Sequence, residues 1–342
     1  MANILILGAG SMGTAFSFPC SDNGHLVSIV GTHLENDFID QIKSSKKHPA
    51  LNCEISKNIT FSKFEKLQEE INKKIDLIVV AVASKGIEWA SLELSRVIRN
   101  NVPILILTKG LSINNNNYEV LAHKMERLLK KNGIKETNIS AAGGPCLAKE
   151  LANKAHTSVV FANNDIKVAK QISKLVSTNY YHVSTSNDVI GVETCAAIKN
   201  IFSMAVGASQ GLCESTKSKE KNYLNTAAAL IQESIYEMIT FVEKLKGKKE
   251  TVIGLAGIGD LYVSADGGRN SKMGEYLGQG MTFNEAKKTK MSNVTVEGAD
   301  LALEIGVKVK KDFDSKTLPL MISMIDTICE EKPLKVDWKS FK

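Results

Sequence analysis

An apolar run that ends in a glycine-rich turn constrains the fold of this chain more than any other feature. Ile4–Leu7 is apolar throughout, residues 8–13 read Gly-Ala-Gly-Ser-Met-Gly, and helical periodicity follows over Met12–Asn23. Glycines suit such a turn because strand and helix approach each other closely there. The order strand, glycine turn, helix predicts the first unit of a doubly wound parallel sheet.

The rest of the first half repeats this alternation. Uniformly apolar runs are typical of strands covered on both faces, and they occur at Leu26–Val30, Leu77–Val82, Ile104–Leu107, Ile139–Ala142, Ser158–Phe161 and Tyr180–Val183. Helical patterns occur at Glu35–Ser44, Gly86–Arg99 and Tyr118–Lys131. Together they predict an α/β domain of the Rossmann type.

The glycine turn also has the form of an anion site. Backbone without side chains allows a pyrophosphate to approach the helix N-terminus, so Gly8, Gly10 and Gly13 predict a bound dinucleotide. The second strand ends in Gly31-Thr32-His33, without the acidic residue that usually binds the ribose and without an arginine for a 2′-phosphate. The choice between NAD and NADP therefore stays open.

The pattern changes near Ser186–Asn187. Beyond it we find helical periodicity and almost no strand signal, at Asp188–Leu212, Leu224–Leu245, Met273–Leu277, Phe283–Thr289, Val296–Ile305 and Leu318–Glu330. We expect a dinucleotide-binding domain over residues 1–187 and an all-α substrate domain over residues 188–342. Ser215–Lys221 is expected to be a polar surface loop.

Composition argues against several other classes of protein. Lys+Arg exceed Asp+Glu by 43 to 37, a mildly basic balance that suits anionic small molecules better than nucleic acid. No apolar stretch is expected to reach the roughly 18–20 residues that span a membrane, and the chain begins with a core strand rather than a leader. The six cysteines and six histidines are scattered without metal-ligand spacing. This predicts free thiols in the cytoplasm and no metal site.

Lys199 is the strongest candidate for catalysis. It lies in a helix that is apolar nearly all round and is therefore expected to be buried. An apolar setting lowers the pKa of an ammonium group, which suits a lysine that transfers protons. The alternative, a lysine whose stem reaches solvent, is disfavoured because the helix offers no polar face. Asn200 adds a polar group beside it.

Three further segments carry polar groups at places where ligands bind. Lys109 and Gly144 follow two of the expected strands, at the carboxyl edge of the sheet. The glycine-dense Gly254–Leu261 contains an acidic residue, Asp260. Residues 267–270 read Gly-Gly-Arg-Asn at a helix start, where a guanidinium, an amide and free backbone N–H groups form a phosphate site.

With these residues assembled, the chain resembles the NAD(P)-dependent glycerol-3-phosphate dehydrogenase family over nearly its whole length. The motifs that carry the resemblance are residues 8–15, 108–111, 144–145, 193–200, 225–230, 254–261, 268–270 and 296–298. The resemblance implies reversible reduction of dihydroxyacetone phosphate to sn-glycerol 3-phosphate, which supplies glycerophospholipid synthesis. It implies NAD or NADP as cofactor and no metal.

The resemblance also implies roles for individual residues. Lys199 is implied as the acid–base, Lys109 as a contact to substrate and cofactor, and Asp260 as the group that organises the lysines. The implied substrate contacts also include Gly144, Cys146, Asn200, Gly268, Arg269 and Asn270. The implied cofactor contacts also include Ser11, Met12, His33, Ala148, Arg269 and Glu297. One departure is Cys146-Leu147, which stands where the family usually has Ser or Thr followed by Phe, so a thiol replaces a hydroxyl.

Two alternatives remain from the sequence. Another two-domain dehydrogenase, acting on a hydroxy acid or ketopantoate, would also combine a glycine turn with a lysine on a helix of the second domain. A dinucleotide-sensing protein without catalysis would need the glycine turn alone. The expected partners are a small-molecule substrate and cofactor, with no nucleic acid and no integral membrane association, and a homodimer is the assembly to test.

Overall fold

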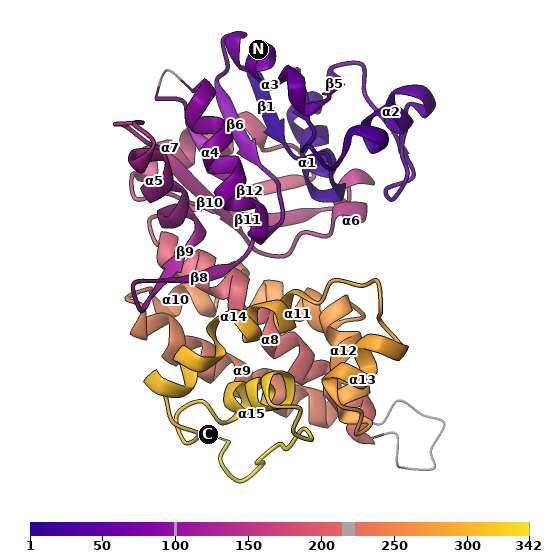
Figure 1. The fold of residues 1–342 in the computed structure, drawn as a ribbon, viewed down its shortest axis with the longest axis vertical. Helices are drawn as coiled ribbons and strands as arrows, with labels where there is room; N and C mark the ends of the chain where they lie inside the picture. Colours follow the sequence, from indigo (N-terminus) through magenta and orange to yellow (C-terminus); the bar gives the residue numbers. More distant parts are fainter. Residues whose placement is uncertain (99–100, 214–222, 342) are drawn as a thin grey trace. The chain divides into compact units, whose positions relative to one another are not determined.

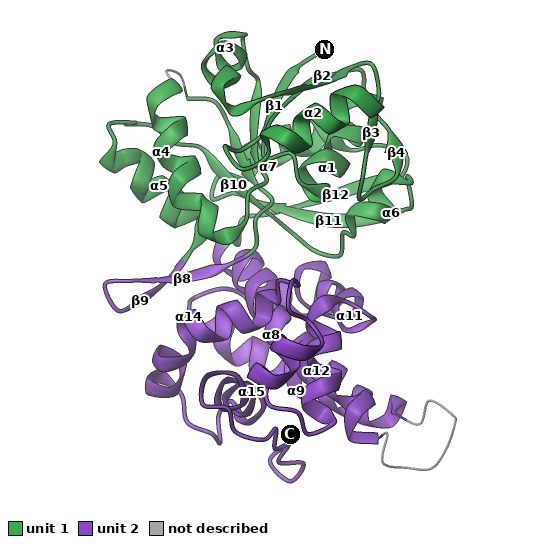
Figure 2. Ribbon diagram, turned by 45° about the vertical axis from the view of Figure 1, so that its right-hand side comes forward, with its two compact units in different colours: residues 1–109, 120–189 green, residues 110–119, 190–342 purple. Residues whose placement is uncertain are grey.

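A computed structural model describes residues 1–98, 101–213 and 223–341 (Figure 1). The chain divides into two compact units, Met1–Lys109 with Val120–Val189 and Gly110–Glu119 with Ile190–Lys342 (Figure 2). The sequence pattern predicts a single boundary after residue 187. In the structure the main boundary follows Val189, and residues 110–119 belong to the second unit. The predicted loop Ser215–Lys221 lies outside the described residues.

The first unit is built on an eight-stranded sheet in the order β12-β11-β10-β7-β6-β1-β2-β5. Its strands are β1 (Asn3–Leu7), β2 (Leu26–Val30), β5 (Ile59–Ser62), β6 (Leu77–Val80), β7 (Ile104–Ile106), β10 (Ile139–Gly143), β11 (Thr157–Ala162) and β12 (Tyr181–Ser186). Every predicted strand lies in this sheet. β5, which was not predicted, is an edge strand with only Ile59 and Phe61 buried.

Buried apolar residues explain the parallel pairing at the centre of the sheet. All of β6 is buried, and β1 pairs in parallel with β6 on one side and β2 on the other. The predicted parallel, doubly wound sheet is confirmed, with one departure, because β10 and β11 are antiparallel. Their connection contains only α6 (Ala148–Ala152). A five-residue helix spans roughly 7.5 Å, too short to carry the chain back along a strand.

The helices of the first unit are α1 (Ser11–Asp22), α2 (Asn36–Ser45), α3 (Leu67–Asn72), α4 (Ile87–Val97), α5 (Leu121–Lys131), α6 and α7 (Ile166–Val176), with a small hairpin of β3 (Lys47–His48) and β4 (Cys53–Glu54). In the sheet, β2 lies beside β1 toward the β5 edge, whereas β7 lies beside β6 toward the β12 edge, so the strand order reverses between β1 and β6. Right-handed crossovers then put α1 and α4 on opposite faces. The loop after β1 therefore lies at the point where the strand order reverses, which is where ligands of such sheets bind.

The second unit is helical apart from a hairpin of β8 (Leu111–Asn114) and β9 (Asn117–Val120). The described part of residues 188–342 is helical, which confirms the predicted all-α domain, and the hairpin joins it from earlier in the chain. The helix predicted to start at Tyr118 begins instead at Leu121, because residues 117–120 form β9. The helices are α8 (Val189–Cys213), α9 (Leu224–Lys244), α10 (Lys249–Val252), α11 (Asp260–Ala265), α12 (Arg269–Gly278), α13 (Phe283–Thr289), α14 (Glu297–Asp312) and α15 (Pro319–Cys329). A π-helical turn, Leu255–Gly259, precedes α11.

Helix α8 is the core of the second unit. It is long and apolar enough to cross a membrane, with a mean hydropathy of 1.4, contrary to the expectation that no stretch reaches that length. However, 94% of its most apolar window is buried inside the protein, as in the core helix of a globular fold. The charges of Glu193 and Lys199 interrupt the run, which hid its length from the sequence analysis.

Glycines allow α8 and α12 to cross with their backbones in contact. A Cβ built on Gly274 of α12 would lie 1.8 Å from the carbonyl oxygen of Met204 in α8. Conversely, a Cβ on Gly211 of α8 would lie 2.1 Å from the carbonyl oxygen of Glu275. Neither distance is possible for a real side chain. The crossing therefore requires glycine, and it fixes the start of α12 relative to α8.

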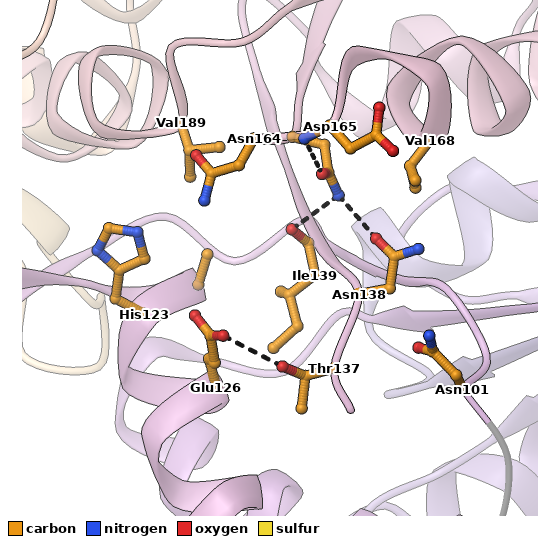
Figure 3. Close-up of a pocket in the computed structure, with 12 residues that line it drawn as sticks. Asn101, His123, Glu126, Thr137, Asn138, Ile139, Asn164, Asp165, Val168 and Val189 are labelled. Atoms are coloured by element: carbon orange, nitrogen blue, oxygen red, sulfur yellow. Dashed lines mark hydrogen bonds between the residues drawn. The ribbon is translucent and has the colours of Figure 1, made fainter. Parts of the chain in front are cut away.

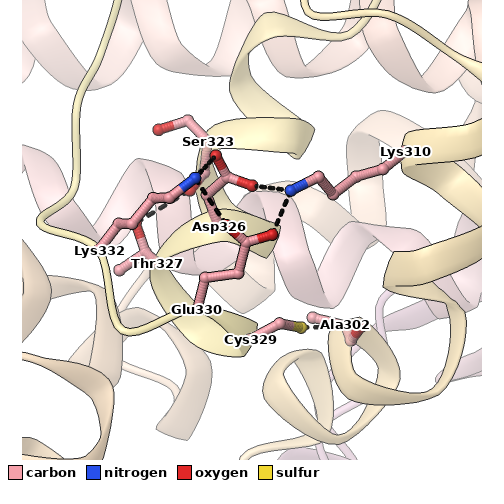
Figure 4. Close-up of polar contacts among 8 residues, drawn as sticks. All are labelled: Ala302, Lys310, Ser323, Asp326, Thr327, Cys329, Glu330 and Lys332. Atoms are coloured by element: carbon pink, nitrogen blue, oxygen red, sulfur yellow. Dashed lines mark hydrogen bonds and ion pairs between the residues drawn. The ribbon is translucent and has the colours of Figure 1, made fainter.

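Two polar arrangements hold α15 in the second unit. The buried carboxylate of Glu237 accepts the backbone N–H of Met321 at 2.8 Å and that of Leu320, so a side chain from α9 caps the first turn of α15. At the other end, Lys310 of α14 pairs with Asp326 at 2.6 Å and with Glu330 (Figure 4). Lys332 binds the same two acids.

Candidate active site

The glycine turn has the geometry needed for a dinucleotide. Gly8 has a φ of +112°, and a Cβ there would lie 2.7 Å from the Ala81 carbonyl oxygen. A Cβ on Gly13 would lie 2.3 Å from the carbonyl oxygen of Gly8. Ser11 and Met12 open α1, whose first turn has no acidic side chain and whose N-cap, Gly10, makes no side-chain cap. The first N–H groups of the helix are thus available to an anion.

The second strand ends without an acidic residue, as the sequence shows, but the structure brings a carboxylate from beyond it to this place. Glu35 folds back so that its Oε2 accepts the N–H of Thr32 at 2.7 Å and that of Ala9, inside the glycine turn, at 3.2 Å. The signal was present as Thr32-x-x-Glu35, the pattern of a capping box, in which a glutamate binds the N–H three residues earlier. His33 is exposed, and its ring centroid lies 5.2 Å from that of Trp89.

The loops after β7 and β10 meet, as expected from their place in the sheet. The Lys109 ammonium donates to the Gly144 carbonyl at 3.4 Å. Gly144 has a φ of +106°, and a Cβ there would lie 3.2 Å from the Val159 Cα. Cys146 and Ala148 are partly buried and pack against the hydrophobic core of the first unit. The thiol that replaces the family's hydroxyl is therefore a packing group as well as a candidate contact.

In the second unit, Lys199 forms a buried ion pair. Its Nζ lies 2.6 Å from Oδ1 of Asp260, and the two residues are only 5% and 2% exposed. The expected pairing of these residues is thus present. Nζ also donates to the hydroxyl of Ser264, which the sequence analysis missed although Ser264 follows Asp260 by one helical turn. The carboxylate of Asp260 and the hydroxyl of Ser264 each accept a hydrogen bond from the Lys199 ammonium, so the orientation of the ammonium group is fixed.

The glycine-dense segment places Asp260 against α8. Gly257 lies in the π-helical turn, and a Cβ there would be 1.9 Å from the Val252 carbonyl oxygen. The wide turn ends at Asp260, which is the first residue of α11. Such single π-helical turns are frequent at functional sites.

The candidate phosphate-binding residues at the start of α12 are held in two ways. Asn270 is 6% exposed; its amide donates to Oδ1 of Asn200 at 3.1 Å, and its own Oδ1 accepts the N–H of Gly298 at 2.9 Å. Asn270 therefore joins α8, α12 and α14. Arg269 pairs with Glu297, and both side chains are largely exposed, 58% and 41%. Gly268 is the N-cap of α12.

The candidate residues thus fall in both units, and none of them lines the polar cavity described next. A cavity of about 320 Å³ in the first unit is polar (Figure 3), lined by Asn101, Ala122, His123, Glu126, Thr137, Asn138, Ile139, Asn163, Asn164, Asp165, Val168 and Val189. Asn163 satisfies its amide there by donating to Asn138 and to the Ile139 carbonyl. Within the described residues, no three His, Cys, Asp or Glu side chains are placed to hold a metal ion.

Comparison with known families agrees with this geometry. Residues 3–169 match the family model described as the N-terminus of NAD-dependent glycerol-3-phosphate dehydrogenase, and residues 188–337 match that of its C-terminus. The chain belongs to this family. The second model begins at residue 188, next to the change from the α/β unit to the helical unit after Val189.

Individual relatives match most of the chain. The NADP(+)-dependent glycerol-3-phosphate dehydrogenase of Archaeoglobus fulgidus is 30% identical over 314 residues, covering 90% of this chain and 91% of that protein. The glycerol-3-phosphate dehydrogenase [NAD(P)+] of Francisella tularensis subsp. novicida is 33% identical, covering 86% and 84%. The crystal structure of glycerol-3-phosphate dehydrogenase from Coxiella burnetii has a TM-score of 0.81 at 25% identity, covering 97% and 96%. A ketopantoate reductase from Ralstonia eutropha shares the fold less closely, with a TM-score of 0.57.

Proposed function

We propose that this protein is an NAD(P)-dependent glycerol-3-phosphate dehydrogenase that interconverts dihydroxyacetone phosphate and sn-glycerol 3-phosphate. The observation that carries the proposal is the buried pair of Lys199 and Asp260, which stands in the same unit as the Arg269 helix start. An ammonium so deeply buried is costly for the fold, and a catalytic use explains its presence. The guanidinium of Arg269 supplies recognition of a phosphate.

In the reduction, Lys199 gives a proton to the oxygen that becomes the hydroxyl at C2. Its positive charge favours the transition state, in which that oxygen gains negative charge, over the neutral ketone. The carboxylate of Asp260 and the hydroxyl of Ser264 orient the ammonium. In oxidation, a neutral Lys199 accepts the proton, so this direction is favoured at higher pH. The nicotinamide cofactor, when bound, supplies or takes up the hydride.

The other assignments complete the proposed site. Lys109, Gly144 and Cys146 contact the substrate from the first unit, while Asn200, Gly268 and Asn270 support its phosphate in the second. Cofactor contacts are assigned to Gly8, Gly10, Ser11, Met12, Gly13, His33, Lys109, Ala148, Arg269 and Glu297. Because Arg269 already pairs with Glu297, a bound phosphate must compete with that carboxylate or share the guanidinium with it.

We also propose a cellular location, a use for the product and an oligomeric state. All six cysteines are free thiols, in keeping with a reducing cytoplasm. The product would enter glycerophospholipid synthesis. A homodimer remains the assembly to test, for example by light scattering.

The experiment is oxidation of NADH and of NADPH, followed by absorbance, with dihydroxyacetone phosphate, unphosphorylated dihydroxyacetone and ketopantoate. We expect turnover only with the phosphorylated ketone. Arg269→Lys keeps the charge but loses the two-pronged guanidinium, so it should raise KM for dihydroxyacetone phosphate. Lys272→Ala, an exposed cation on the same helix paired with Glu275, is the matched control and should behave like wild type. Turnover of ketopantoate alone would establish the other dehydrogenase class, and cofactor binding without any turnover would establish a sensor.

A further inference from the structure

The polar cavity of about 320 Å³ lies at the edge of the sheet opposite the glycine turn (Figure 3). Ile139, the first residue of β10, lines it, whereas Gly144 of the candidate site follows the last residue of the same strand. A five-residue strand spans roughly 16 Å. The cavity is therefore separate from the carboxyl edge, where the dinucleotide is proposed to bind. Its volume lies at the lower end of the range for small-molecule sites, roughly 300–1,000 Å³.

Asn163 builds one wall of this cavity and fixes its position. The residue is 4% exposed, and its amide donates to Oδ1 of Asn138 at 3.1 Å and to the hydroxyl of Ser140 at 2.8 Å. Its own Oδ1 accepts the N–H of Asp165 at 2.8 Å. The start of β10 is thereby tied to the N-cap of α7. A wall that is fixed before a ligand arrives needs little ordering when the ligand binds.

Several neutral polar side chains around this wall still have hydrogen-bonding capacity. Within the part of the chain that the structure describes, the side chains of Asn101, His123 and Asn164 make no hydrogen bond, and Nδ2 of Asn138 donates none. Figure 3 shows His123 and Asn164 on one side of the Ile139 side chain, and Asn101 and Asn138 on the other. An amide both donates and accepts hydrogen bonds, and so does a neutral imidazole. These groups suit a ligand that carries donors and acceptors over its whole surface.

The charged groups at the cavity indicate a neutral ligand. Of the described residues that line it, none is lysine or arginine, and the carboxylates of Glu126 and Asp165 would repel an anion. Neither carboxylate needs a cation from a ligand, because Oε1 of Glu126 lies 2.6 Å from the Lys130 ammonium and Oδ1 of Asp165 accepts the N–H of Lys167 at 2.9 Å. Both can still accept hydroxyl hydrogens, since an ionised carboxylate has about four acceptor positions.

We propose that this cavity binds a small neutral molecule rich in hydroxyl groups, such as a hexose or a cyclic polyol. Hydroxyls of the ligand donate to the carboxylates and accept from the amides. Its C–H groups pack against the apolar side chains that line the rest of the cavity, Ile139, Val168 and Val189 among them. The site is independent of the proposed reaction and contains no residue assigned to it.

The test is direct binding to the full chain. Saturation-transfer NMR and isothermal titration calorimetry would compare two neutral probes, glucose and myo-inositol, with putrescine as a cation and inorganic phosphate as an anion. We expect saturable binding of a neutral probe in the millimolar range. His123→Ala and Asn164→Ala should each weaken this binding about two- to tenfold, because each removes one hydrogen bond to the ligand. Asn153→Ala, which changes an exposed asparagine outside the cavity lining, is the matched control and should bind like wild type.

The results separate this site from the proposed active site. Failure of both neutral probes to bind, or binding of putrescine or phosphate alone, would overturn the proposal. Binding that both alanine variants leave unchanged would also overturn it, because the probe would then occupy another place, the catalytic site included. A protein that binds a neutral probe through His123 and Asn164 but does not reduce dihydroxyacetone phosphate would support the cavity site and refute only the proposed reaction.

Discussion

Replacing Lys199 with methionine separates a catalytic lysine from a structural one, and the structure changes what this substitution should do to the fold. From the sequence, methionine in an apolar helix would be neutral or mildly stabilising if Lys199 were only structural. However, Asp260 is 2% exposed and lies 2.6 Å from the ammonium, so Lys199→Met leaves a buried carboxylate without its cation. Breaking a buried pair in this way costs about 3–5 kcal/mol. For a unit of this size the melting temperature should fall by roughly 10 °C.

A double variant tests whether the lost stability comes from the unpaired carboxylate of Asp260. Lys199→Met combined with Asp260→Asn has no uncompensated charge, so it should regain at least half of the lost stability. Lys310→Met is the matched control, because its ion pairs are far more exposed, and it should cost about 1 kcal/mol or less. Thermal and urea unfolding of the four proteins would measure these differences.

Among these variants, the rate of reduction should not recover when the stability of the fold recovers. The Lys199→Met protein, assayed well below its melting temperature, should reduce dihydroxyacetone phosphate at least about 10²-fold more slowly, and the double variant should stay slow although its fold is restored. A double variant with nearly normal kcat would remove Lys199 from the mechanism. A single variant as stable as wild type would show that the pair is not buried as described.

Three other features of the structure give testable predictions about stability. Gly274→Ala places a Cβ 1.8 Å from a carbonyl oxygen and should destabilise the α8–α12 crossing by at least about 1–3 kcal/mol in urea unfolding; stability equal to wild type would refute the close crossing. Glu237→Leu leaves two buried N–H groups of α15 without their acceptor and should cost about 1–3 kcal/mol, with Glu237→Gln milder, as measured by thermal unfolding. Burial raises the pKa of Asp326, but the hydrogen bonds from its lysine partners, Lys310 among them, outweigh this and hold it below its usual value. Its stabilising contribution is therefore complete above the unfolded pKa of about 3.9 and is lost as pH falls through the lower folded value. Melting temperature below about pH 4 should then drop less steeply in Lys310→Met than in wild type, and identical acid profiles would contradict the pairing.

Local signals in the sequence determined much of this protein. Uniformly apolar runs such as Leu77–Val80 predicted the central strands, because a strand buried on both faces needs no polar position. The glycine-rich sequence predicted the backbone conformation of the turn after β1, since only glycine tolerates the φ of Gly8 and its close approach to Ala81. A lysine in an apolar helix showed that Lys199 must be buried and must have a partner.

The resemblance named Asp260 as the partner of Lys199, but only the tertiary structure showed the contact and the other groups that join it. Lys199 finds Asp260 at a separation of 61 residues, and the hydroxyl of Ser264 joins them because a π-helical turn sets the direction of α11. Glu35 lies beyond the second strand, and the tertiary structure brings its carboxylate to the N–H of Ala9, 26 residues earlier in the chain. A sequence pattern shows that a buried charge or a bare backbone needs a partner. The partner's identity depends on how elements pack, which is a property of the whole chain and not of any one segment.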